Sequence, residues 1–374
     1  MLTPHDDLPL HQTPEPLARV ATAAADHYDR YFFNGHTADG SLFFAAAMGH
    51  YPNRDVADAA FCVVHEGLQH SVFASGRCPR DRATRVGPIR VEVLEGLRTL
   101  RVTVEPNETG VVADVTFRAR TPAVEEPRQT VVRDDRLVMD YTRLTQWGTW
   151  EGVVGHGARR HDVDPRHVRG VRDRSWGIRP VGEPTPTNAP PSIPQVFWLW
   201  APLHFDEVCT HLATFEHADG RPWLASGAVV PVLDHPGAPT WGLDEPAREM
   251  ATIRRELTWR PGTREMATAA LELVEFGGDT HRIELERHLS FRMRGVGYLH
   301  PTFRHGSAHG ELTVGAETLD LADLDPRDPA NIHIQTVVTA RWGDRVGTGV
   351  LEQLVIGPHE PTGLTGIVDG HPGP

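Results

Sequence analysis

The sequence contains no lysine, so all 37 of its basic residues are arginines. This absence excludes chemistry that needs an amine side chain: a Schiff base, a lysine-anchored pyridoxal phosphate, a phosphate-loop lysine or a lysine general base. Acidic residues are in excess, and the formal net charge is −13. Because phosphate binding requires clustered positive charge, nucleic acid and anionic membrane surfaces are not expected as main partners.

Cysteine is also scarce. The chain has only Cys62, Cys78 and Cys209, an odd number of widely spaced residues that suits neither a disulfide framework nor a CxxC metal site. The first residues show no basic patch followed by an apolar run, so no secretory signal is expected. No stretch of about 18 apolar residues is present to span a bilayer. These features predict a cytoplasmic protein without an integral membrane segment.

The fingerprints of several common cofactor and hydrolase sites are missing as well. No glycine-rich run follows a predicted strand and opens a helix, as a dinucleotide-binding fingerprint requires, and neither GxSxG nor HExxH occurs. Nicotinamide redox chemistry and hydrolysis by a serine nucleophile are therefore disfavoured. We expect no cofactor and no metal.

Alternation of apolar and polar residues is the dominant pattern in the chain. It runs through 100–104 and 111–119, which a Pro-Asn-Glu-Thr-Gly turn joins into a hairpin, and again through 282–293. Further strands are predicted at 59–64, 150–155, 196–200, 209–216, 224–231, 333–341 and 348–356. Only residues 17–31 show helical spacing, and they predict one helix. The pattern predicts an all-β protein with few helices, its antiparallel sheets curled into barrels or sandwiches.

A proline-rich segment divides the chain almost in half. Residues 180–194 contain six prolines, which a central strand cannot accommodate because proline lacks the backbone N–H. The segment is typical of an interdomain linker or a long crossover connection.

A dense polar motif lies just before this segment, with the sequence Arg172-Asp173-Arg174-Ser175-Trp176-Gly177. In an extended strand, Asp173 and Ser175 would face one side and the two arginines and Trp176 the other. Asp173 is therefore a candidate acid or base. Arginines within about 4–6 Å would lower its pKa, whereas burial away from them would raise it. The alternative is that an Arg-Asp ion pair only holds a seam between domains.

A second group of candidates lies in residues 295–310, where Tyr298, His300 and His305 offer proton donors and acceptors near neutral pH. A zinc site built from His305 and His309 is disfavoured, because in an extended segment they would lie roughly 13 Å apart. The alternative is that these histidines bond the backbone in turns.

Aromatic residues and one carboxylate mark two other predicted strands. Trp198 and Trp200 would share one face of their strand, while Phe197 and Leu199 occupy the other. The two tryptophans could form the wall of a hydrophobic ligand cavity or pack in a core between sheets. Glu352 lies in an otherwise apolar strand, where it could complement an arginine of the first motif.

Together these motifs resemble the bacterial superfamily of AttH-like and carotenoid hydratase-like proteins. The resemblance covers most of residues 30–357 and rests, in chain order, on Tyr51-Pro52-Asn53-Arg54, the motif at 172–177, Gly297-Tyr298-x-His300-Pro301 with His305-Gly306, and Gly347-x-Gly349-x-x-Glu352. In that superfamily the central motif usually reads Arg-Asp-His-Ser-Trp-Gly, and Arg174 stands here where the histidine is common. A mechanism that relies on this histidine does not transfer to the chain.

The resemblance implies two consecutive lipocalin-like β-barrel domains with a cavity near their junction. The corresponding boundaries are 1–22 for a leader, 23–182 for the first domain, 183–194 for the linker, 195–360 for the second domain and 361–374 for a tail.

By analogy, Asp173 would protonate an alkene or a leaving hydroxyl, with Tyr298, His300 or His305 as relay. The substrate-binding residues would be Trp176, Trp198, Trp200, Arg172, Arg174, Phe303 and Glu352, the tryptophans shielding a carbocation-like state.

The combined expectation is a cofactor-independent hydratase, dehydratase, isomerase or cyclase that acts on a lipophilic, isoprenoid-like small molecule. Characterised members of the superfamily include cofactor-independent carotenoid hydratases, and related folds include cyclases. Two alternatives remain open at this point: a lipid- or terpenoid-binding protein without turnover, and a metalloenzyme that uses some of the 22 histidines.

Overall fold

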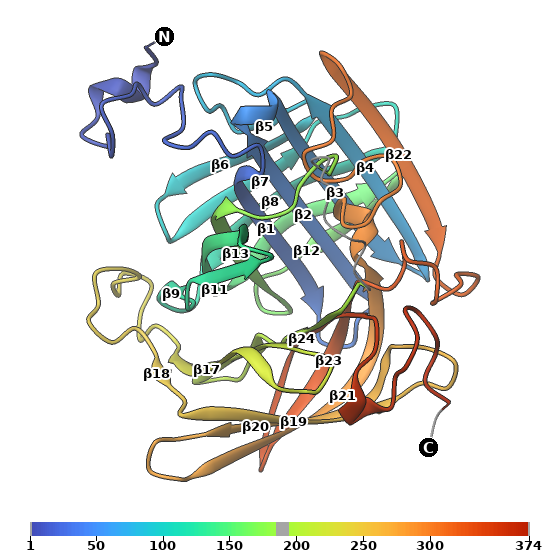
Figure 1. The fold of residues 1–374 in the computed structure, drawn as a ribbon. Coiled ribbons are helices and arrows are strands. Elements are labelled where there is room, and N and C mark those ends of the chain that lie inside the picture. Colours follow the sequence, from blue (N-terminus) through green and yellow to red (C-terminus); the bar gives the residue numbers. More distant parts are fainter. Residues whose placement is uncertain (1, 185–193, 373–374) are drawn as a thin grey trace.

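The computed structural model describes residues 2–184 and 194–372. Within these ranges the protein consists of antiparallel β-strands and four short 3-10 helices, without an α-helix. The strands form two sheets, and Figure 1 draws the first, blue to green with the orange strand β22, above the second, which is yellow to red. The predicted all-β class with antiparallel sheets is thus confirmed. No helix in the described part of the chain is long and apolar enough to cross a membrane.

The first sheet contains fourteen strands, and its main path runs β22-β4-β3-β2-β1-β13-β11-β8-β7-β6-β5. Strands β9, β10 and β12 pair with the long β11 outside this path. The strands are β1 (His27–Thr37), β2 (Leu42–Tyr51), β3 (Val56–His65), β4 (Leu68–Gly76), β5 (Arg85–Val86), β6 (Ile89–Glu95), β7 (Thr99–Val104), β8 (Val111–Ala119), β9 (Val124–Glu125), β10 (Gln129–Arg133), β11 (Arg136–His156), β12 (Arg159–Val163), β13 (Val168–Ile178) and β22 (Leu312–Asp320).

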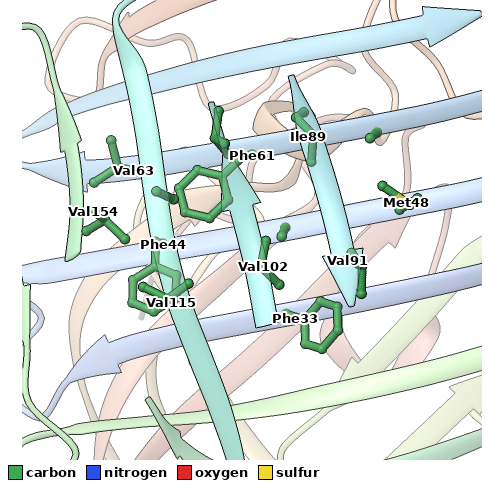
Figure 2. Packing of buried hydrophobic residues seen from close by; sticks show 14 of the residues in the cluster. Phe33, Phe44, Met48, Phe61, Val63, Ile89, Val91, Val102, Val115 and Val154 are labelled. Atoms are coloured by element: carbon green, nitrogen blue, oxygen red, sulfur yellow. The ribbon is translucent and has the colours of Figure 1, made fainter. Parts of the chain in front are cut away.

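This sheet curls around its own hydrophobic core. Phe33, Phe44 and Phe61 are almost fully buried there, together with valines of β6, β7 and β8 on the facing wall (Figure 2). The two ends of the strand path also meet. A Cβ at Gly87, directly after β5, would lie 3.3 Å from Val314 in β22. Because the end strands approach each other, the sheet forms a nearly closed barrel.

The second sheet contains ten strands in the order β18-β17-β16-β14-β24-β23-β21-β20-β19, and β15 pairs with β16 and β24 beside this path. The strands are β14 (Val196–Trp200), β15 (Leu203–His204), β16 (Val208–Glu216), β17 (Pro222–Pro231), β18 (Arg248–Glu249), β19 (Thr252–Trp259), β20 (Met266–Val274), β21 (Thr280–Arg292), β23 (Ile334–Trp342) and β24 (Arg345–Ile356). The 3-10 helices are η1 (Pro4–Asp7), η2 (Pro52–Arg54), η3 (Met293–Val296) and η4 (Glu360–Thr362).

The two sheets pack against each other through a further hydrophobic core, separate from the core inside the first sheet. Phe43 of β2 stacks on Phe291 of β21 with ring centroids 4.7 Å apart, and Trp147 and Trp200 are buried in the same cluster. Strand β22 also links the halves of the chain, since it pairs antiparallel with β4 (Figure 1). The residues that could form a site between the halves are therefore held by two packed sheets.

The predicted helix at residues 17–31 is wrong. Residues 17–26 form turns and irregular structure, and residue 27 begins strand β1, which pairs with both β2 and β13. The apolar residues of this segment, such as Tyr28, bury their side chains in the sheet instead of along a helix face. Tertiary pairing outweighed the local helical spacing.

The proposed domain boundaries remain a prediction. Residues 185–193, the central part of the predicted linker 183–194, lie outside the described residues.

Candidate active site

A cavity of about 320 Å³ lies between the two sheets, close to the end of β13. Strands of both halves contribute to its wall, as do the residues that follow β13 and η3. Its lining comprises Arg133, Met139, Tyr141, Arg143, Arg179, Pro180, Val181, Gly182, Gln195, Val196, Trp198, Phe215, Trp223, Gly297, Tyr298, Leu299, Arg304, His305, His333, Glu352 and Leu354. Four residues proposed from the sequence are among them: Trp198, Tyr298, His305 and Glu352.

One wall of the cavity is a ladder of stacked aromatic rings. Trp198 stacks on Phe215 with centroids 4.2 Å apart, and Phe215 stacks on Trp223 at 4.4 Å. The Arg143 guanidinium also lies over the ring of Trp198, 4.9 Å from its centroid. This wall offers an extended flat surface to an apolar ligand. Trp200, by contrast, is buried in the core between the sheets and does not line the cavity.

Glu352 occupies the centre of a hydrogen-bond network at the base of this wall. Its buried carboxylate accepts from Trp198 Nε1 at 3.0 Å, His333 Nε2 at 2.9 Å and Gln335 Nε2 at 2.6 Å. Burial alone would raise the pKa of Glu352, but these hydrogen bonds and the neighbouring His333 hold the pKa below its usual value. The carboxylate is therefore ionised at neutral pH and accepts a hydrogen bond from Nε2–H of His333.

The donor directions in this network are set by the first sheet. The backbone N–H of Val171 donates to Asn34 Oδ1, so Asn34 Nδ2 must donate to Gln335 Oε1, which it does at 2.9 Å. Gln335 then directs its own N–H group at Glu352. Because the chain starts at a backbone donor, no amide in it can reverse without losing a hydrogen bond.

His333 presents its second nitrogen without a partner. In the neutral form of the ring whose Nε2 donates to Glu352, Nδ1 carries the lone pair, and it has no hydrogen-bond partner among the described residues. Tyr298 stands against the same imidazole, edge to face, with ring centroids 4.6 Å apart. A buried imidazole with one nitrogen anchored and the other unpaired has the hydrogen-bonding pattern of a general base.

Arg30 and His305 also contact Tyr298. Arg30 donates to its hydroxyl oxygen at 2.5 Å, and the hydroxyl proton has no acceptor within the described residues. His305 lies edge to face with the same ring at 4.7 Å, and its Nδ1 is 3.8 Å from Asp58. Burial lowers the pKa of His305 to about 4, so its ring is neutral at pH 7.

Asp173 lies on the strand face predicted from its motif but is not among the residues that line the cavity. Together with Ser175 it shares the side of Tyr28, while Arg172 and Arg174 extend to the other side of β13, next to Tyr31. Burial raises the pKa of Asp173 to about 6, against the opposing charges of Arg143 and Arg30. Its catalytic role stays a prediction.

Asp173→Asn is expected to stabilise the protein at alkaline pH. The folded pKa of about 6 exceeds the ordinary value of 3.8, so this carboxyl group favours folding fully below pH 3.8 and loses that contribution as pH rises through 6. Asparagine imitates the neutral acid. We expect a gain of up to about 3 kcal/mol in the free energy of unfolding at pH 8 and almost none at pH 4, measured by urea denaturation. Equal or lower stability of the variant at pH 8 would contradict the raised pKa.

The three substrate-binding candidates of the central motif lie on the other side of β13 and do not line the cavity. Arg172 is buried and donates from Nε to Gln146 at 2.9 Å, and Arg174 stacks on Tyr31 and pairs with Asp29. Trp176 is 42% exposed on the same side of the strand. These contacts hold β13 against its neighbours, and they place none of the three side chains at the cavity wall.

His300 and Phe303 also lie outside the cavity lining. His300 Nδ1 accepts the backbone N–H groups of Thr302 and Phe303, at 3.0 and 2.9 Å, as the turn interpretation predicted for at least one histidine. Phe303 stacks on Phe73 of β4 at 5.2 Å. Both residues thus shape the loop that carries Tyr298 and His305.

A family model for proteins of unknown function (DUF8625) matches residues 2–365. The chain belongs to this family. No curated protein matches it in sequence. Three solved structures are similar to this member of DUF8625: kievitone hydratase from Nectria haematococca, a protein described as AttH from Nitrosomonas europaea, and CghA with Sch210972.

The identities to these structures are low and the coverage is high. Kievitone hydratase is 13% identical with a TM-score of 0.50, over 87% of this chain and 88% of that chain. The AttH protein is 11% identical with a TM-score of 0.51, over 92% and 98%. CghA is 12% identical with a TM-score of 0.50, over 95% and 97%. The DUF8625 chain therefore shares the fold of AttH-like proteins, as its motifs predicted.

The sequence analysis missed several residues of this DUF8625 cavity, above all His333, Arg143, Arg179, Phe215 and Trp223. One pattern could have revealed His333: it alternates with Gln335 at the start of an apolar strand, as Glu352 interrupts another. Two neighbouring apolar strands with polar residues on one face indicate a buried polar network. The arginines and aromatic rings carry no such pattern.

A metal site has no support from the placement of the histidines. Among residues 2–184 and 194–372, no group of three or more histidine, cysteine, aspartate or glutamate side chains is arranged to hold a metal ion. The metalloenzyme alternative therefore has no candidate ligand set in this part of the chain.

Proposed function

We propose that the protein is a cofactor-independent lyase, isomerase or cyclase that converts a lipophilic, isoprenoid-like small molecule in the cavity between the sheets. One observation carries the proposal: His333, anchored to Glu352 through Nε2, keeps a buried and unpaired Nδ1 and is part of the wall of a cavity that an aromatic ladder also lines. An acid or base in an apolar cavity is the minimum that proton transfer to or from a hydrocarbon skeleton requires.

His333 would act as the general base. Nδ1 takes a proton from the substrate, or from a water molecule that adds to it, and the imidazolium that forms is stabilised by the Glu352 carboxylate 2.9 Å from Nε2. The same carboxylate keeps the ring in the tautomer that leaves Nδ1 free. Trp198 and Gln335 fix the carboxylate in turn, so the base is held in place before the ligand binds.

Tyr298 would act as the general acid. The Tyr298 oxygen accepts a hydrogen bond from Arg30, so its own O–H group can donate to the substrate. The arginine charge stabilises the negative charge that develops on the oxygen as the proton leaves. Neutral His305 and the ladder of Trp198, Phe215 and Trp223 give the cavity an apolar wall that excludes water from the reacting carbons.

The similar structures support this class of reaction. One of them is named kievitone hydratase, and another was solved with Sch210972, so proteins of this fold include a hydratase and a protein that binds a small molecule.

We propose that Asp173, on which the charge of Arg143 acts, is a further proton donor or acceptor. Its pKa of about 6 allows it to exchange protons near neutral pH.

The test starts from the molecule that copurifies with the protein. Mass spectrometry of a denatured sample identifies it, and the molecule is then incubated with fresh enzyme in H₂¹⁸O and, separately, in D₂O. A hydratase gives a product with one ¹⁸O; an isomerase or a cyclase incorporates deuterium at carbon without ¹⁸O. Recovery of the molecule unchanged and unlabelled, at concentrations that saturate binding, would overturn the enzymatic proposal in favour of a binding protein.

A further inference from the structure

The cavity wall has an unusual charge for this chain. Its lining residues include the four arginines Arg133, Arg143, Arg179 and Arg304 and a single carboxylate, Glu352, which three donors already occupy. The whole chain, in contrast, carries a formal charge of −13. Positive charge has therefore been concentrated at the one place where a lipophilic ligand would lie.

The four arginines differ in their partners. Arg143 pairs with Glu126, and Arg304 pairs with Glu183 at 2.6 Å. Arg179 is half-buried and has no ion-pair partner among the described residues. Its guanidinium lies instead over the ring of Tyr28, 4.7 Å from the centroid, and 5.8 Å from that of Tyr298.

A guanidinium held between aromatic rings at a cavity wall presents its edge to whatever enters. The planar fork of arginine matches two oxygens of one anionic group, and such charge-assisted pairs are stronger than neutral hydrogen bonds. Removing a guanidinium from water without an anion is costly, so an anionic ligand would complete this site.

We propose that the cavity binds a lipophilic molecule with an anionic oxygen head group, a carboxylate or an enolate, and that Arg179 holds this head group. The inference rests on the proposed function only in that both use the same cavity. The head group lies at Arg179, and the apolar body extends along the ladder of Trp198, Phe215 and Trp223. This orientation brings the carbons next to the head group toward Tyr298, whose ring neighbours the same guanidinium.

The experiment uses two fluorescent probes that differ mainly in charge: anionic 1-anilinonaphthalene-8-sulfonate and uncharged N-phenyl-1-naphthylamine. Displacement of each by farnesoic acid and by farnesol gives a matched pair of affinities. We expect the wild type to bind farnesoic acid at pH 8 at least about tenfold more tightly than farnesol. Arg179→Met should abolish this preference and leave the affinity for farnesol within about twofold.

Two further variants keep the result interpretable. Arg169→Met removes an arginine from β13 that also has no ion pair in the described residues but lies outside the cavity lining, and it should retain the preference. Arg179→Lys keeps the positive charge and should retain part of the preference for farnesoic acid. This variant keeps the inference testable if Arg179→Met does not fold. Equal affinities of the wild type for the acid and the alcohol, or equal losses for both in Arg179→Met or Arg179→Lys, would overturn the inference. Binding needs no turnover, so this failure is separate from failure of the isotope test.

Discussion

Replacing His333 by glutamine is expected to lower kcat by about 10²–10⁴-fold with the substrate identified by the isotope test. Glutamine can still donate an N–H group to Glu352, so the hydrogen-bond network persists. It has no nitrogen that can accept a proton at the position of Nδ1. The loss should therefore appear in kcat, while KM changes little because the aromatic ladder is untouched.

The control for this variant is His288→Gln. His288 lies on β21 of the same sheet and is also bonded through Nε2, to Thr339 Oγ1 at 2.8 Å, but it does not line the cavity. Steady-state kinetics of both variants, with circular dichroism to confirm folding, should show the loss of kcat in His333→Gln and a wild-type kcat in His288→Gln. Wild-type kcat in His333→Gln would remove His333 from the mechanism and leave the reaction without its proposed base.

Glu352→Gln should lower kcat by a similar factor, although the side chain keeps its size. Its amide must keep the carbonyl oxygen toward Gln335, because the direction of that amide is set through Asn34 by a backbone N–H group. The new NH₂ group then faces His333 Nε2, which has to become an acceptor. The ring proton moves to Nδ1, and the nitrogen that served as base is occupied.

The same substitution leaves the indole N–H of Trp198 without its acceptor, which should cost about 1–3 kcal/mol of stability. Trp198→Phe is the matched control, since it removes this hydrogen bond but leaves Glu352 as a carboxylate and His333 in its original tautomer. We expect its kcat to exceed that of Glu352→Gln by at least about tenfold. Equal kcat values for the two variants would show that the tautomer of His333 is irrelevant to the reaction.

The motif around Asp173 shows that alternation along a strand predicts which face a side chain occupies but not its pKa. The sequence places Asp173 and Ser175 on one face and Arg172 and Arg174 on the other, and the contacts of β13 confirm it. The pKa of Asp173 could not follow from this alternation. It depends on burial and on Arg143 and Arg30, which come from β11 and β1 and are distant in sequence.

Of the other candidate residues, some line the cavity and some do not, and the tertiary arrangement of loops and strands decides which. Tyr298 and His305 reach the cavity, while His300, between them in the chain, turns back to bond two backbone N–H groups. Trp198 lines the cavity and Trp200, two residues later on the same strand face, is buried in the core. Residue type alone did not separate these cases, because the position along the loop or the strand decided which side chains reach the cavity.

The sequence by itself determined many of the strands and their two faces, the absence of lysine chemistry and the resemblance to AttH-like proteins, because these depend on local alternation and on residue identity. Only the tertiary structure decided that His333, Gln335 and Glu352 form one network with Asn34, and that Arg179 lines a cavity and has no anionic partner within residues 2–184 and 194–372. The reason is physical: hydrogen bonds and charges act over a few ångströms, and here those distances join residues as many as 301 positions apart in the chain.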